Sequence, residues 1–98
     1  MRQVVLSENK REAKDTRVAV IRIIVEYEDS VEKLNAILHE YGSYIFGRMG
    51  IPYRQRGVSV ISIAIDAPQD VINTVCGSIG RLPGVTSKAA YSNVTARE

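Results

Sequence analysis

Two segments of the chain, Arg17 to Tyr27 and Val58 to Asp66, carry residues in the period of two that is typical of a β-strand. In the first, Ala19, Ile21, Ile23 and Val25 form one face, and Val18, Val20, Arg22 and Ile24 form the other. In the second, the two faces are Ile61, Ile63 and Ile65, and Val58, Val60, Ser62 and Ala64. Because β-branched residues dominate in both segments, we expect two central strands.

A helical pattern follows each of these strands. The first has its apolar positions at Val31, Leu34, Ile37, Leu38 and Tyr41. Asp29 and Glu32 predict a capping box at its start, and Gly42 predicts a left-handed cap at its end. The second begins at Pro68, ends at Pro83-Gly84, and has its apolar stripe at Val71, Ile72, Val75, Cys76, Ile79 and Leu82.

Two further strands are predicted, at Tyr44 to Met49 and at Val85 to Tyr91, with a long hairpin connection at Gly50 to Gly57. The order strand, helix, strand, strand, helix, strand indicates an α+β fold, the ferredoxin-like βαββαβ sandwich. Right-handed crossovers put both helices on one face of a four-stranded antiparallel sheet. We therefore expect one domain at residues 17–92, a flexible polar extension at 1–16 and a C-terminal tail at 93–98.

The second face of the predicted sheet is too apolar to be left in water. Its apolar members on the two central strands are Val18, Val20, Ile24, Val58, Val60 and Ala64. Another subunit is the simplest cover, so we expect a homo-oligomer, a dimer or a tetramer. The alternative is a modestly apolar face that stays solvated.

The net charge of the 98-residue chain is +2, from 13 Lys and Arg against 11 Asp and Glu, so direct binding of nucleic acid is not expected. A DNA-contacting arm at residues 1–16 is the weaker alternative to a solvated extension, because its charges nearly cancel. The longest apolar run, Val18 to Val25, is interrupted by Arg22 and is short of the roughly 20 residues of a membrane span. A single cysteine, Cys76, fits a cytoplasmic location.

No set of residues in the sequence marks a reaction. His39 is the only conventional neutral-pH base, and we interpret it as a surface or boundary residue beside the first helical stripe. Cys76 is interpreted as a small filler on the second helix. The sequence predicts no catalytic residues, no metal site and no cofactor, and hence a protein that is not an enzyme.

The segment Gly47 to Gly57 is the strongest candidate for a binding site. Glycines let a backbone approach a ligand closely, and arginines present planar donors to a carboxylate or phosphate. A small anionic effector would suit this mixture, and the predicted ligand-binding residues are Gly47, Arg48, Met49, Gly50, Tyr53, Arg54 and Arg56. The alternative is a twisted hairpin with strain-relieving glycines and solvated arginines.

Three stretches, Ser30 to Gly42, Gly47 to Ser62 and Gly80 to Val85, resemble the family of iron-only hydrogenase system regulators. The resemblance implies an ACT-like fold, related to the regulatory domain of the nickel-responsive repressor, and a role in regulating hydrogenase assembly or expression. Two features depart from those relatives. The turn at Glu28-Asp29-Ser30 lacks the glycine of a typical ACT domain, and His39 and Cys76 alone cannot form a similar nickel site.

The sequence leaves two functional hypotheses open. In the first, the chain is a regulatory module that binds a small effector at an oligomer interface. In the second, it is a protein-interaction module that docks a hydrogenase maturation or transcription partner without a small ligand.

Overall fold

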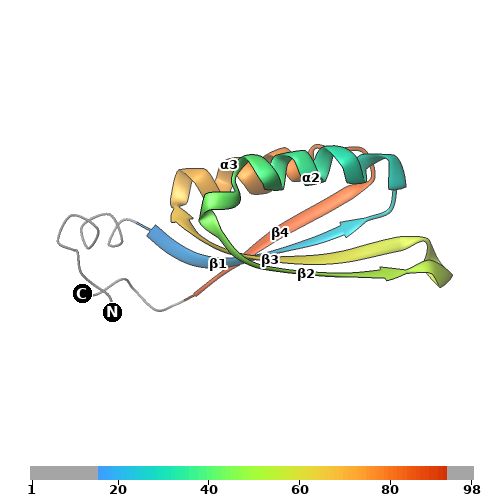
Figure 1. Cartoon of the computed structure of the whole chain (residues 1–98), viewed down its shortest axis with the longest axis horizontal. Helices are drawn as coiled ribbons and strands as arrows, with labels where there is room; N and C mark the ends of the chain where they lie inside the picture. The colour runs from blue at the N-terminus through green and yellow to red at the C-terminus, as the bar shows by residue number, and fades with distance from the viewer. Residues whose placement is uncertain (1–15, 93–98) are drawn as a thin grey trace.

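The computed structural model describes residues 16–92 (Figure 1). Its main elements are β1 (Thr16–Val25), α2 (Val31–Glu40), β2 (Ile45–Tyr53), β3 (Val58–Pro68), α3 (Gln69–Gly80) and β4 (Val85–Tyr91). Short 3-10 turns lie at η1 (Glu28–Ser30), η2 (Gly42–Tyr44) and η3 (Arg54–Arg56). The C-terminal tail and all of the predicted N-terminal extension except Thr16 lie outside the described residues.

The four strands form one sheet in the order β2-β3-β1-β4, and every neighbouring pair is antiparallel. Both helices cover the same face of this sheet (Figure 1). Each helix connects two strands that are separated in the sheet by a third one, which is the split βαβ arrangement. The predicted α+β, ferredoxin-like class is therefore confirmed.

The hydrophobic core lies between the helices and the covered face of the sheet. Leu34 and Leu38 of α2 and Ile72, Val75 and Ile79 of α3 are at most 5% exposed. The sheet contributes Ala19, Ile21, Ile23, Val25, Ile61, Ile63, Ile65, Ala67 and Val85 to the same cluster. The alternation in β1 and β3 thus predicted the correct inner face of both strands.

The two predicted caps of α2 were wrong. Its N-cap residue is Ser30, which makes no side-chain cap, because the Ser30 hydroxyl instead donates a 2.6 Å hydrogen bond to the Pro83 carbonyl across the fold. Asp29 belongs to the turn η1. Gly42 begins η2, and the positive-φ glycines of the described chain are Gly57 and Gly84.

The β2–β3 hairpin is longer and its connection shorter than predicted. β2 continues through Gly50 to Tyr53, and only η3 and Gly57 join it to β3. Pro52 is tolerated because β2 is an edge strand, where a missing N–H can face away from the ladder. A register shift between Ile45 and Gly47 marks a bulge near the start of β2.

Candidate functional site

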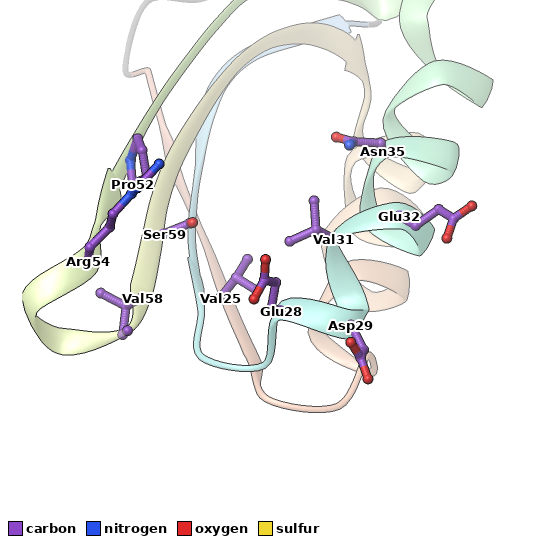
Figure 2. A pocket seen from close by; sticks show the side chains of 11 residues that line it. Val25, Glu28, Asp29, Val31, Glu32, Asn35, Pro52, Arg54, Val58 and Ser59 are labelled. Atoms are coloured by element: carbon purple, nitrogen blue, oxygen red, sulfur yellow. The ribbon is translucent and has the colours of Figure 1, made fainter.

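An open groove lies between the β2–β3 hairpin and the beginning of α2 (Figure 2). Its volume is about 1140 Å³. The lining residues come from the end of β1, from η1 and α2, and from the hairpin: Val25, Glu28, Asp29, Val31, Glu32, Asn35, Pro52, Arg54, Gly57, Val58 and Ser59. Chain segments far apart in the sequence therefore form its two walls.

The walls of this groove combine apolar and charged groups. Glu28, Val31 and Asn35 lie on the side that faces the hairpin, whereas the carboxylates of Asp29 and Glu32 are directed away from it at the rim (Figure 2). Arg54 lies on the hairpin wall (Figure 2). A ligand here would meet Glu28 on one side and Arg54 on the other.

A smaller hollow of about 430 Å³ continues along α2 toward its C-terminal end. It is lined by Asn35, Leu38, His39, Gly42, Ile45, Arg48 and Ile63, and no carboxylate is among them. Arg48 reaches across from β2, and its Nη2 donates a 2.8 Å hydrogen bond to Oδ1 of Asn35. Asn35 lines both spaces, so the two hollows adjoin, and together they are called the α2 groove.

The structure divides the predicted ligand-binding residues between the two faces of the sheet. Three of them face away from the helices. These are Gly47, which pairs with Ala64 of β3, Met49, which pairs with Ser62, and Tyr53, which pairs with Val58. Gly50 pairs with Ile61 and Arg48 with Ile63, which places both on the helix side. Arg54 lines the α2 groove, while Arg56, in η3, lines neither of its two parts.

Only Arg48 and Arg54 of the predicted set therefore lie in the α2 groove. Residues that sequence reasoning did not select are Glu28, Asn35 and His39. Asn35 and His39 are four positions apart on α2, a spacing that places both on one side of the helix. That spacing, beside a stripe of buried leucines, was the available indication that α2 presents polar groups to β2.

Two other features are absent from residues 16–92. Within them, no group of three or more His, Cys, Asp and Glu side chains is placed to hold a metal ion. No helix in the same range is long and apolar enough to cross a membrane.

The chain is similar to known proteins in both structure and sequence. The structure titled as that of the uncharacterized protein TM1266 from Thermotoga maritima matches with a TM-score of 0.75 and 26% sequence identity. The match covers 78% of this chain and 96% of that one. No curated protein matches the sequence. A family model described as "TM1266-like: Iron-only hydrogenase system regulator, putative" matches residues 17–89, so the chain belongs to this TM1266-like family.

Proposed function

We propose that the protein is a non-enzymatic regulatory module of the iron-only hydrogenase system, acting in the cytoplasm as an oligomer that senses a small effector. The observation that carries this proposal is the α2 groove, a pair of adjoining hollows with Arg54 in the larger one and Arg48 in the smaller one. The family description, that of a system regulator, supports a regulatory role over a catalytic one.

The charges along the α2 groove favour one end of it for an anionic group. The part around Arg48 and His39 has no carboxylate in its lining, whereas Glu28, Asp29 and Glu32 line the part around Arg54. Only one donor of the Arg48 guanidinium is bonded within residues 16–92, to Asn35, and an arginine has five. The remaining donors can bind a carboxylate or phosphate of the effector.

The position of the α2 groove also suggests how binding would be sensed. Its walls belong to two separate units, the helix α2 and the β2–β3 hairpin, joined across the opening by the Arg48–Asn35 hydrogen bond. An effector that inserts between them changes their relative position or limits their motion. Binding of a partner to the hairpin would then be coupled to effector binding, because both depend on the position of the hairpin.

The second candidate function is docking of a protein partner in the α2 groove without a small ligand. The size of the site favours it, because about 1140 Å³ for the larger part alone exceeds the roughly 300–1,000 Å³ of most small-molecule pockets. In this case a polypeptide segment of a maturation or transcription partner would occupy the groove.

The test is thermal unfolding of the chain with a panel of anionic metabolites, nucleotides and amino acids. A ligand at 100 times its Kd stabilises by about 2.7 kcal/mol, and each kcal/mol raises the Tm of a domain this size by roughly 4–8 °C. Arg48→Ala should remove the shift, and Arg56→Ala is the matched control because Arg56 lines neither part of the groove. An equal shift in both variants would refute the site, and a flat panel would favour the docking function.

A further inference from the structure

The sheet face that points away from the helices, here called the open face, carries two positive charges at directly paired positions. Arg22 of β1 pairs with Lys88 of β4, and both residues are exposed on this face. Side chains directly opposite each other in an antiparallel pair have Cβ atoms about 4.5–5.5 Å apart, and like charges there are destabilising. Val20 and Ile24 flank Arg22 on the same face, and they strengthen the repulsion because they displace part of the water that would screen it.

Two hydroxyl groups lie beside these charges on the open face. Ser62 of β3 pairs with Arg22 from the other side, and Thr86 is two residues before Lys88 on β4. None of the four side chains forms a hydrogen bond or ion pair with another residue of the described range. Ser62 is only partly exposed, so its hydroxyl has limited access to water. Four hydrogen-bond donors thus lie together without a partner among residues 16–92.

No carboxylate in the described part of the chain is placed to neutralise these two charges. Around Arg22 and Lys88 on the open face, the paired, diagonal and adjacent positions contain neither Asp nor Glu. Asp66 is four residues beyond Ser62 on β3, and Glu26 is four residues beyond Arg22. At about 3.3 Å per residue, four residues span roughly 13 Å, more than the Debye length of about 8 Å at physiological ionic strength. A counter-charge for this pair therefore has to come from outside residues 16–92.

We propose that the open face binds the phosphate group of a small molecule at a site formed by Arg22, Ser62, Thr86 and Lys88. A phosphate monoester carries about 1.5 to 2 negative charges at pH 7, which matches the two cations, and it has three strong acceptor oxygens for the four donor side chains. A carboxylate has one charge and two oxygens, and would leave part of the site unpaired. Because the α2 groove lies on the other face of the sheet, this is a second and separate binding site.

Binding at this site stabilises the sheet across three of its strands. The donors come from β3, β1 and β4, which are neighbours in the sheet, so one phosphate group connects all three. The repulsion between Arg22 and Lys88 is replaced by the attraction of both to one anion. Phosphate also stabilises folded proteins in general as an excluded salt, but that effect does not saturate and does not depend on one pair of side chains.

The test is a titration of the isotope-labelled full chain with inorganic phosphate, followed by amide chemical shifts, with sodium chloride of equal ionic strength as reference. Saturable shifts should appear at the amides around Arg22, Ser62 and Lys88. Lys88→Ala should weaken phosphate binding by about tenfold or more, because a charge-assisted hydrogen bond is lost. Lys33→Ala, at an exposed position of α2, is the matched control and should leave the affinity unchanged. Arg48→Ala, in the α2 groove, should also leave it unchanged.

Charge reversal gives a second test that needs no ligand. Lys88→Glu places opposite charges across β1 and β4, so in sodium chloride it should raise the Tm by roughly 2–6 °C, and it should abolish phosphate binding. The proposal is overturned if phosphate causes no saturable shift at these amides, if Lys88→Ala binds phosphate like the wild type, or if Lys88→Glu does not raise the Tm. An effector-induced shift in Tm that depends on Arg48 would persist in Lys88→Ala, so failure of this site and failure of the effector site are distinguishable.

Discussion

The two faces of the sheet are built from the same strands and almost the same residue types, yet one is buried and the other is exposed. On the covered face of β1, Ile21 and Ile23 are completely buried, whereas Val20 and Ile24 on the open face are 39% and 42% exposed. The difference arises from α2 and α3, which cover one face only (Figure 1). Hydrophobicity alone therefore does not decide burial within one chain.

The faces also differ in the polar residues that they contain. The buried positions of β1 and β3 carry no charge, whereas the open face of these strands includes Arg22, Ser62 and Asp66. A charge is tolerated where water or a second copy can solvate or pair it, and it is costly under a helix layer. Folding of the single chain thus depends on one face, and the other remains available for assembly.

The largest expected effect comes from the covered face. Ile63 is fully buried in the core cluster, so Ile63→Ala should lower the free energy of unfolding by about 2–5 kcal/mol through lost apolar contact and the cavity left behind. Urea unfolding followed by circular dichroism measures this loss. A loss below about 1 kcal/mol would mean that the core does not depend on this contact.

The next effect concerns the turn that joins α3 to β4. Gly84 has φ +67°, and a Cβ atom there would lie 2.5 Å from Cβ of Tyr27. Gly84→Ala should therefore cost about 2–4 kcal/mol, from the left-handed backbone and the clash together. Gly57, at the tip of the hairpin, has the same φ but open space around it, so Gly57→Ala should cost only about 1 kcal/mol.

Thermal unfolding of these two alanine variants side by side separates the two causes. Equal losses would show that backbone strain alone matters at Gly84 and that the Tyr27 contact relaxes without cost. A larger loss for the Gly84 variant would show that the turn between α3 and β4 is packed against Tyr27, in contrast to the open hairpin tip.

A smaller loss is expected from Ser30, the one buried polar residue of the described core. Its hydroxyl holds the Pro83 carbonyl at 2.6 Å and so joins the start of α2 to the turn after α3. Ser30→Ala should destabilise by about 1–2 kcal/mol, because the carbonyl loses its side-chain partner in a partly buried site. Ser43→Ala, at an exposed position of η2, is the control and should change stability by less than about 0.5 kcal/mol in chemical unfolding.

Much of the fold was predictable because the strands and helices have strong and different periods. The alternation in β1 and β3 gave the inner face, and the stripe through Leu34 and Leu38 gave the buried side of α2. The predicted N-cap was wrong because α2 begins after Ser30 and not after Asp29, and no local pattern reveals that the Ser30 hydroxyl bonds to a distant carbonyl. The connection of the hairpin was predicted too long because glycine and proline, which are usual turn residues, are also tolerated in an edge strand.

The candidate site was predicted less well than the fold. Residue types along Gly47 to Gly57 suggested one cluster, but strand alternation sends Arg48 to the groove and Met49 to the opposite face. The prediction of one cluster took no account of the strand expected at Tyr44 to Met49, in which neighbouring residues face opposite sides. The other wall of the groove, at Glu28 and Asn35, comes from a part of the chain that the segment contacts only after folding.

The smallest effect is expected on the open face, and it should depend on the concentration of the chain. Val60 is 42% exposed in the single chain, so Val60→Ala should cost less than about 1.5 kcal/mol of unfolding free energy when the protein is dilute. At concentrations where two copies pair, the same substitution also removes contacts with the second copy, and the loss should increase. Urea unfolding of wild type and variant at two widely separated concentrations measures both values. If the loss is the same at both, the open face is not covered by a second copy, and the contrast between the two faces is one between a core and a solvated surface.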